Sequence, residues 1–327
     1  MSADGMLVVL TSPAPPELFS GALPEGSRVV AAGYDELLAL APQADVIIGD
    51  WTHVIRVDRA VIERTTRCRL IQQPTAGYEN VDLEAADSKG IPVANAGPAN
   101  ANAVAEHAVM GIIGCLRRLR EAITDAERGG WDQQRWIAMD LDDLYDRTVG
   151  ILGLGATGMA LAQRLKGFEC RTLYFKRTRL DPADEERLDV AYADREELLR
   201  RSQVLVLTLP LNPETRGLID AERLALLPPG AVVVNVSRGA IVDEAALADA
   251  LRSGRLGGAA LDVFAEEPLP PGHPLAALPN VILTPHIAGV TAQSKRNILV
   301  NSIGNVARVL RGETPQFVVN HPQRVGA

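Results

Sequence analysis

The sequence has few cysteines and no long apolar runs, and each absence argues against a class of protein. Only three cysteines occur in 327 residues: Cys68, Cys115 and Cys170. Their odd number and wide spacing favour neither a disulfide framework nor a metal site, so we expect three reduced thiols and no metal. No apolar run approaches the ~20 residues of a membrane helix, and the N-terminus lacks the features of a secretory signal. We therefore expect a cytoplasmic protein with no membrane partner.

Positive charge is also in short supply. Lysine and arginine number 33 against 41 aspartate and glutamate, which gives a formal net charge of −8. This acidic balance argues against a nucleic-acid partner, because such a protein needs a basic surface. The hydrophobic share of 47% and the charged share of 23% are those of an ordinary globular protein. At roughly 150 residues per domain, the length favours two domains.

The first hundred residues alternate short apolar runs with helical stretches. The expected strands are Leu7–Leu10, Arg28–Ala31, Val46–Ile48, Leu70–Gln72 and Pro92–Ala94. The expected helices are Glu17–Ser20, Tyr34–Leu40, Arg59–Arg64 and Leu83–Lys89. Strands that alternate with helices predict a parallel sheet covered on both faces, which is a small doubly wound domain.

A long helical stretch, Asn100–Arg120, separates this region from a second series of strands. It is apolar on more than one side, so we expect it to be buried between domains or against another chain. Six strands follow it: Thr148–Leu152, Arg171–Phe175, Val204–Leu209, Ala231–Val236, Gly258–Val263 and Val281–Thr284. Six parallel strands with helical crossovers are typical of a complete dinucleotide-binding domain.

The last helical stretch, Ala292–Arg311, is expected to cross back to the first domain. The predicted fold class is therefore α/β, with two doubly wound parallel-sheet domains. A Rossmann cofactor domain, residues 100–294, is inserted in a flavodoxin-like substrate domain that comprises residues 1–99 and 295–327.

A glycine-rich turn follows the first strand of the second series. It reads Gly153-Leu154-Gly155-Ala156-Thr157-Gly158 and opens a helical pattern. A lone G-x-G-x-x-G is weak evidence, but this one stands between a strand and a helix, the context that dinucleotide binding requires. Gly153 allows the tight turn, Gly155 lets the backbone approach a pyrophosphate, and Gly158 lets the helix pack on the strand. The pyrophosphate would lie at a helix N-terminus, where free N–H groups favour negative charge.

The next strand ends in a basic cluster, where dinucleotide folds usually carry an acidic residue. The acid would hold the adenosine ribose hydroxyls, but here the strand Arg171–Phe175 leads into Lys176-Arg177-Thr178-Arg179. Basic side chains attract a 2′-phosphate that a carboxylate would repel. The sequence therefore favours NADP over NAD, and the alternative is an exposed loop that accepts either cofactor.

Residues that can do chemistry follow the other strands of this domain. Ligands in open parallel sheets bind beyond the carboxyl ends of the strands. The third strand leads to Leu209-Pro210, and the fourth leads to Ser237-Arg238-Gly239. The fifth leads to Asp262 and Glu267, and the sixth leads to His286. Taken singly, Arg238, Glu267 and His286 could be ordinary surface residues, but together on the cofactor edge they indicate a catalytic set.

The chemistry of ketone reduction explains this set. The reaction needs a hydride on carbon, which a nicotinamide supplies, and a proton on oxygen, which histidine can supply near neutral pH. A carboxylate beside the histidine fixes its tautomer and stabilises the imidazolium. Arginine binds a substrate carboxylate in a fork and polarises the carbonyl. We therefore assign the catalytic roles to Arg238, Glu267 and His286, with a small-molecule 2-keto acid as substrate.

Over nearly its whole length the chain resembles the D-isomer-specific 2-hydroxyacid dehydrogenase family. The motifs that carry the resemblance are Ala76–Asp82 (AGYENVD), Val104–His107 (VAEH), the glycine turn, Asn235–Gly239 (NVSRG), Leu261–Pro268 (LDVFAEEP) and Thr284–Ile287 (TPHI). The resemblance implies that Arg238 and His286 bind substrate, and that backbone around Ala76 and Gly77 holds its carboxylate. It also implies that Asp262 contacts the nicotinamide carboxamide, and that two chains dimerise through the helix around residues 100–120. His107 is interpreted as structural.

The cofactor positions combine the glycine turn, the basic cluster and the strand ends that match the family. They are Val104, Gly153, Gly155, Ala156, Thr157, Gly158, Lys176, Arg177, Thr178, Leu209, Pro210, Val236, Ser237, Arg238, Asp262, His286 and Gly289. The basic cluster is similar to that of the NADPH-preferring glyoxylate and hydroxypyruvate reductases of the family, which we take as the expected activity. Formate dehydrogenase relatives carry glutamine at the position of Glu267, which disfavours that reaction.

Two other activities remain open at this point. Phosphite dehydrogenase shares the arginine, glutamate and histidine set on the same scaffold. The transcriptional corepressors of the family also keep these residues and act as cofactor-sensing binding proteins, although the acidic composition speaks against this second activity. The motifs do not name the substrate.

Overall fold

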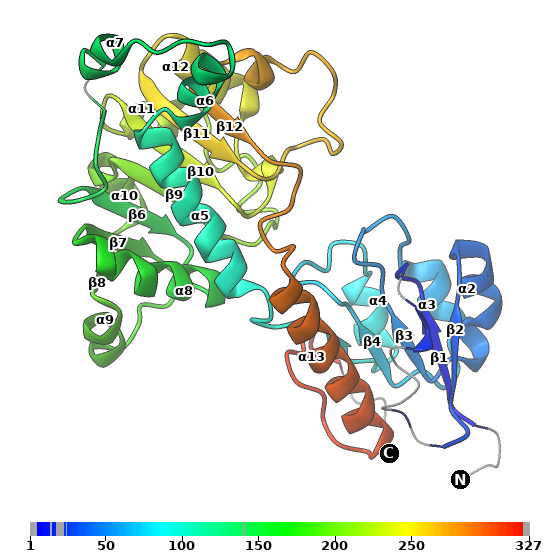
Figure 1. Ribbon diagram of the computed structural model, residues 1–327. Helices are drawn as coiled ribbons and strands as arrows, with labels where there is room; N and C mark the ends of the chain where they lie inside the picture. The colour runs from blue at the N-terminus through cyan, green and yellow to red at the C-terminus, as the bar shows by residue number, and fades with distance from the viewer. Residues whose placement is uncertain (1–4, 14, 18–22, 24, 140, 323–327) are drawn as a thin grey trace. The chain divides into compact units, whose positions relative to one another are not determined.

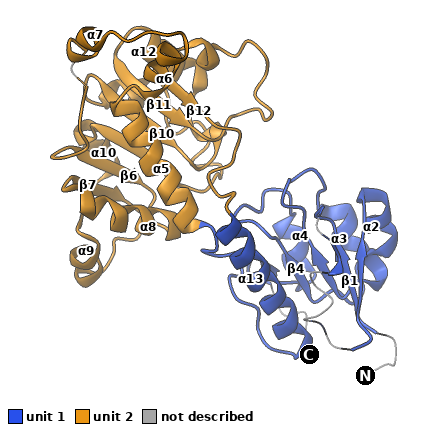
Figure 2. Ribbon diagram, in the orientation of Figure 1, with its two compact units in different colours: residues 1–100, 292–327 blue, residues 101–291 orange. Residues whose placement is uncertain are grey.

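The computed structural model describes residues 5–13, 15–17, 23, 25–139 and 141–322 and divides the chain into two compact units (Figure 1, Figure 2). Unit 1 comprises Met1–Asn100 and Ala292–Ala327, and unit 2 comprises Ala101–Thr291. These boundaries lie one residue after position 99 and three residues before position 295, where the sequence placed them. Across the described ranges, no helix has the length and apolar character needed to cross a membrane.

Unit 1 contains a five-stranded, all-parallel sheet with the strand order β2-β1-β3-β4-β5. The strands are β1 (Leu7–Leu10), β2 (Arg28–Ala31), β3 (Val46–Ile48), β4 (Leu70–Gln72) and β5 (Val93–Ala94). The helical elements are α2 (Tyr34–Leu40), η1 (Ala41–Gln43), α3 (Arg59–Arg64), α4 (Leu83–Ser88) and α13 (Ala292–Leu310). This is the flavodoxin-like order that the sequence predicts.

Apart from the edge strand β2, the sheet of unit 1 is buried on both faces, and continuous apolar strands such as β1 and β3 produce this arrangement. One face packs against α2, α3 and α4, and the other packs against α13 through Val306 and Val309. Of the expected helix Glu17–Ser20, residues 18–20 lie outside the described part of the chain.

Unit 2 contains a seven-stranded parallel sheet with the order β12-β11-β10-β9-β6-β7-β8. Its strands are β6 (Thr148–Leu152), β7 (Arg171–Phe175), β8 (Val190–Tyr192), β9 (Val204–Leu207), β10 (Ala231–Asn235), β11 (Leu256–Leu261) and β12 (Val281–Leu283). The expected count of six strands was wrong, because β8 is a three-residue edge strand on β7. A three-residue segment that is partly exposed is too short to show the alternation of apolar and polar residues that predicts a strand.

Helices cover both faces of this sheet. They are α5 (Ala101–Leu116), α6 (Leu119–Glu127), α7 (Gln133–Ile137), α8 (Ala156–Leu165), α9 (Pro182–Leu188), α10 (Arg195–Arg201), α11 (Ala221–Leu226) and α12 (Glu244–Arg252), with short turns η2 (Lys166–Phe168), η3 (Gly239–Ile241) and η4 (Pro274–Ala277). The single helix expected over Asn100–Arg120 was wrong, because Arg118 adopts a left-handed conformation (φ 45°) that separates α5 from α6. Within unit 2, α5 packs closely on the sheet, and a Cβ at Gly111 would lie only 2.8 Å from the Ala260 Cβ.

Candidate active site

Three chemically active side chains follow three adjacent strands of unit 2. Arg238 comes after β10, Glu267 lies in the loop after β11, and His286 comes after β12. Because β12, β11 and β10 are neighbours in a parallel sheet, their carboxyl ends lie at one edge. The structure therefore brings together the residues that the sequence placed on this edge.

His286 and Glu267 form a directly hydrogen-bonded pair. The His286 Nδ1 atom lies 2.7 Å from Glu267 Oε2, and both side chains keep access to solvent, with 47% and 36% of their surfaces exposed. The second carboxylate oxygen, Oε1, accepts a 2.8 Å hydrogen bond from the backbone N–H of Phe264. With Nδ1 facing the carboxylate, Nε2 is the ring nitrogen left to meet a reacting group.

The environment of Glu267 keeps its carboxylate ionised. Partial burial by itself raises the pKa of Glu267, but the hydrogen bonds from His286 and from Phe264 N–H outweigh that effect. The charges of His286 and Arg238 act in the same direction, and the net pKa of Glu267 is lowered. An ionised carboxylate at this position stabilises a protonated imidazole.

Arg238 stands at the start of η3, on a turn that the buried Asn235 organises. The Asn235 side chain donates to the Arg238 carbonyl (2.9 Å) and accepts from the Ser237 N–H and hydroxyl (3.0 and 2.8 Å). The Arg238 guanidinium donates through Nη1 to the Ser237 carbonyl at 2.6 Å. The turn thus fixes the backbone from which the guanidinium projects.

Asp262, at the end of β11, is 2% exposed and holds the segment that carries His286. Its Oδ1 accepts from the Thr284 hydroxyl (2.6 Å) and the Ile287 N–H (2.9 Å), and its Oδ2 accepts from the Ala288 N–H (2.8 Å). Its backbone carbonyl accepts from the His286 N–H at 2.8 Å. The family resemblance implies that Asp262 contacts the nicotinamide, and the structure shows that its carboxylate organises the His286 segment.

The glycine turn has the geometry of a dinucleotide cradle. Gly153 has a φ of +99°, and a Cβ there would meet Leu209 at 2.9 Å. A Cβ at Gly158 would meet the Gly153 carbonyl at 2.4 Å, so α8 needs glycine to pack against the strand. Gly155 is the N-cap of α8 and makes no side-chain capping hydrogen bond. A Cβ at Gly155 would meet nothing within 4 Å, so the space there is open. This open N-terminus of a ten-residue helix fits a pyrophosphate.

The basic side chains after β7 differ in how closely a carboxylate of the protein binds them. Arg179 makes two 2.8 Å hydrogen bonds to Glu185, which also accepts from Tyr174 at 2.6 Å, and these interactions lower the pKa of Glu185 to about 2. Arg177 is 85% exposed and lies 3.9 Å from Glu214. In the described part of the chain, Lys176 has no ion-pair partner.

The remaining expected cofactor positions occupy loops and helix ends of unit 2. Val104 is buried in α5, Leu209 and Pro210 follow β9, Val236 follows β10, and Gly289 follows the His286 segment. Ala156 and Thr157 begin α8, whereas Thr178 is exposed in the loop after β7. Of these, Leu209, Pro210 and Val236 follow β9 and β10, the two strands that lie between β6 and β11 in the sheet.

In unit 1, Ala76 and Gly77 lie in the loop after β4. The Thr75 hydroxyl donates to the Gly77 carbonyl (2.7 Å) and lies 3.3 Å from His53 Nε2. Among the described residues, the backbone N–H groups of Ala76 and Gly77 have no protein acceptor. His53 lies in an irregular loop and belongs to none of the sequence motifs.

Comparisons with known proteins agree with this geometry. A family model described as the NAD binding domain of the D-isomer specific 2-hydroxyacid dehydrogenases matches residues 109–288. A glyoxylate reductase from Pyrococcus furiosus is 38% identical over 271 residues, which are 81% of this chain and 80% of that protein. One from Aeropyrum pernix is 38% identical over 291 residues, 88% and 86% of the two chains.

The solved structures give the same result. A glyoxylate reductase from Paecilomyes thermophila superposes with a TM-score of 0.86 at 29% identity and covers 95% of this chain and 97% of its own. The protein PH0520 from Pyrococcus horikoshii superposes with a TM-score of 0.85 at 33% identity, over 97% and 96% of the two chains. The chain belongs to the D-isomer specific 2-hydroxyacid dehydrogenase family.

Proposed function

We propose that this chain is a dehydrogenase of the glyoxylate reductase type, which reduces a small 2-keto acid to the D-2-hydroxy acid with a nicotinamide cofactor. The observation that carries this proposal is the 2.7 Å pair of His286 and Glu267, on the sheet edge that also carries Arg238 and the glycine turn. The curated relatives named glyoxylate reductase support the substrate class.

The catalytic residues divide the work of ketone reduction. The reduced nicotinamide, when bound, supplies a hydride to the carbonyl carbon. His286, protonated, donates the Nε2 proton to the carbonyl oxygen, while Glu267 holds the Nδ1–H and stabilises the imidazolium. Arg238 binds the carboxylate of the keto acid and polarises its carbonyl. In the reverse direction the neutral His286 removes the hydroxyl proton.

The loop after β4 in unit 1 is proposed to bind the substrate carboxylate. The N–H groups of Ala76 and Gly77, which lack protein acceptors among the described residues, can donate to an anion. A carboxylate bound at this loop would accept from these two backbone donors. Small keto acids meet this requirement through their carboxylate alone.

The cofactor is proposed to be NADP(H). Lys176 and Arg177 follow β7, where the adenosine ribose is held in dinucleotide folds, and neither is engaged as closely as Arg179 is with Glu185. Their positive charges can pair with a 2′-phosphate. NAD(H) remains the alternative, in which Arg177 is simply a solvated side chain near Glu214.

A homodimer in the cytoplasm is part of the same proposal. Large apolar side chains are exposed on and after α5: Met110, Leu119, Ile123, Trp131, Ile137 and Tyr145. A second copy of the chain would bury such side chains. The three cysteines are unpaired, which supports a reducing compartment. Light scattering of the purified protein would test the dimer, since a monomeric mass would contradict it.

Cofactor oxidation assays test the activity directly. We expect glyoxylate or hydroxypyruvate to drive oxidation of the reduced cofactor, with pyruvate and phenylpyruvate as larger comparators. Phosphite with oxidised cofactor is assayed beside them. Turnover only with phosphite would reassign the substrate, and cofactor binding without turnover of any of these compounds would contradict the proposed enzyme.

A further inference from the structure

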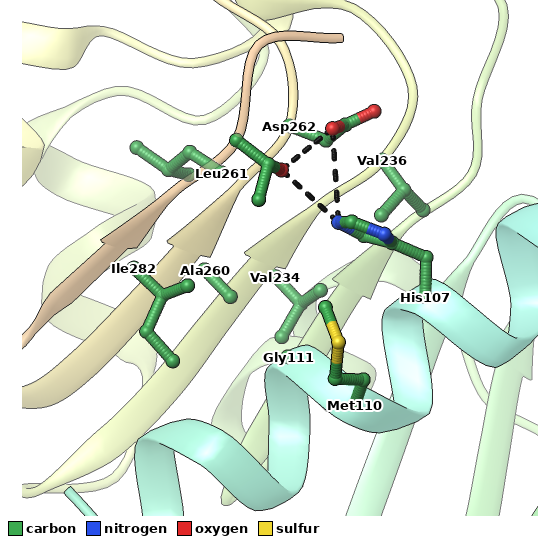
Figure 3. A pocket seen from close by; sticks show the side chains of 10 residues that line it. His107, Met110, Gly111, Val234, Val236, Ala260, Leu261, Asp262 and Ile282 are labelled. Carbon is green, nitrogen blue, oxygen red and sulfur yellow. Dashed lines mark hydrogen bonds and ion pairs between the residues drawn. The ribbon is translucent and has the colours of Figure 1, made fainter. Parts of the chain in front are cut away.

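A partly buried polar cluster of His107, Thr284 and Asp262 lies at the rim of a small pocket between α5 and strands β10, β11 and β12 (Figure 3). The His107 Nε2 atom on α5 lies 3.0 Å from the Thr284 hydroxyl and 3.7 Å from Asp262 Oδ1. The pocket has a volume of only about 10 Å³ and is lined otherwise by apolar side chains. The pocket is too small for a ligand. The cluster is therefore relevant through the backbone segment to which it is hydrogen-bonded.

The proton on the ring of His107 follows from the hydrogen bonds of its neighbours. The Thr284 hydroxyl has a single proton, which it donates to Asp262 Oδ1 at 2.6 Å. The Thr284 oxygen can therefore only accept from His107, which places a proton on Nε2. The series of donors runs from His107 to Thr284 to the Asp262 carboxylate.

The Asp262 carboxylate is the last acceptor of this series, and it also binds the backbone that directly follows His286. It accepts from the N–H groups of Ile287 and Ala288, the two residues that follow His286. His286 itself has a φ of +55°, a left-handed conformation that non-glycine residues rarely adopt and that surrounding contacts must hold. The orientation of the His286 ring thus depends on the Asp262 carboxylate remaining in place.

We propose that His107 and Thr284 are positioning residues for His286. They act through Asp262 and link helix α5 to the backbone conformation of the acid/base residue. This inference rests on the proposed catalytic role of His286. It assigns His107 a part in turnover, beyond the packing that its place on an interior helix requires.

Paired substitutions test the hydrogen bonds separately from the packing. His107→Leu and Thr284→Val remove the donors, whereas His107→Gln and Thr284→Ser keep a donor at the same position. Ile282→Val is the matched control, because Ile282 lines the pocket without a polar contact. We expect the first two variants to lower kcat by up to about tenfold, which is the upper end for the loss of one ordinary hydrogen bond, with the cofactor Kd changed little. The conservative variants and the control should stay within about threefold of the wild type.

Hydrogen–deuterium exchange of the unliganded enzyme gives a readout independent of turnover. In His107→Leu, the amides of Ile287 and Ala288 should exchange faster, while those of the central strands β6 and β9 should not. Unchanged exchange and unchanged kcat in His107→Leu would overturn the inference. A general loss of protection, or failure of His107→Gln to restore kcat, would also overturn it, because His107 would then serve packing alone.

The proposed function can fail separately. If the wild type has no turnover, or His286→Ala keeps it, the catalytic assignment is wrong whatever the exchange data show. If the wild type and His286→Ala behave as expected and His107→Leu is fully active, only the positioning role is wrong.

Discussion

Glu267 Oε2 lies 2.7 Å from His286 Nδ1, while Glu267 Oε1 receives the backbone N–H of Phe264 at 2.8 Å. Each oxygen of the carboxylate therefore has its own donor, one from a side chain that can ionise and one from the backbone. This arrangement fixes the rotation of the carboxylate plane and, through it, the orientation of the imidazole. It leaves Nε2 as the nitrogen that can exchange a proton with substrate.

Replacing His286 by alanine should remove the proton donor and leave cofactor binding nearly unchanged. General acid–base catalysis is typically worth 10²–10⁴-fold, so we expect a fall in kcat of roughly that size. Steady-state kinetics measures kcat, and fluorescence titration measures the Kd of the reduced cofactor. A kcat within a few-fold of the wild type would refute the assignment.

Glu267→Gln tests the charge of the pair with little change in shape. The N–H of Phe264 requires an oxygen opposite it, so the amide nitrogen of glutamine would face His286 Nδ1. A donor at that position opposes the protonated imidazole. Loss of a hydrogen bond to a charged group predicts a fall in the rate of reduction of about 10- to 100-fold.

The pH dependence separates this effect from simple disruption. The pKa of Glu267 is lowered in the folded protein, so its carboxylate should persist through about pH 5 to 8 and be lost only as the pH falls further. In the wild type, reduction should therefore decline at low pH as Glu267 becomes protonated, whereas Glu267→Gln has no carboxylate at this position and should lack that acidic decline. A profile that keeps the wild-type shape at a lower rate would contradict this explanation.

Strong local patterns made most of the fold predictable from the sequence. The strands of unit 1 are short and mostly apolar, all but the edge strand β2 are buried, and their expected and observed bounds agree within one residue. The glycine turn was predictable because Gly153 and Gly158 meet steric requirements that no other residue satisfies. The common edge of Arg238, Glu267 and His286 followed from the rule that parallel strands end together.

The features that the sequence did not reveal depend on one backbone conformation or on contacts between separate elements. The break before α6 rests on one left-handed residue, Arg118, that has no glycine signal. The ion pair of Arg179 with Glu185 joins the loop after β7 to α9. The hydrogen bond of His107 with Thr284 joins α5 to the segment after β12. No spacing or period in a single sequence encodes such pairs, since propensity is local and these contacts arise only on packing.

Arg238→Lys should be a poor substitute, because a lysine ammonium cannot reproduce the planar fork of guanidinium donors. We expect kcat to fall and the KM of the keto acid to rise, with a combined loss in kcat/KM of about 10- to 100-fold. The cofactor Kd is the control measurement. Wild-type kinetics would mean that the substrate carboxylate is held elsewhere, for instance by the loop of Ala76 and Gly77 alone.

Cofactor choice depends on the two cations after β7. NADPH should be preferred to NADH by at least about tenfold in kcat/KM, which requires only ~1.4 kcal/mol of differential binding. Charge-assisted hydrogen bonds to a 2′-phosphate can supply that amount, although exposure of Arg177 weakens them. The double variant Lys176→Asp with Arg177→Ala should shift the preference toward NADH, because it removes attraction and adds repulsion.

Salt and a matched variant decide whether this preference is local. Arg252→Ala, which removes an exposed arginine of α12 paired with Asp249, should leave the preference unchanged. Rising ionic strength should shrink the preference of the wild type, because exposed charges are screened within about 10 Å at 0.1 M salt. If the wild type uses NADH better than NADPH at moderate salt, Lys176 and Arg177 form only a solvated loop and the assignment of NADP(H) is wrong. That result would leave the assignment of the catalytic residues unchanged.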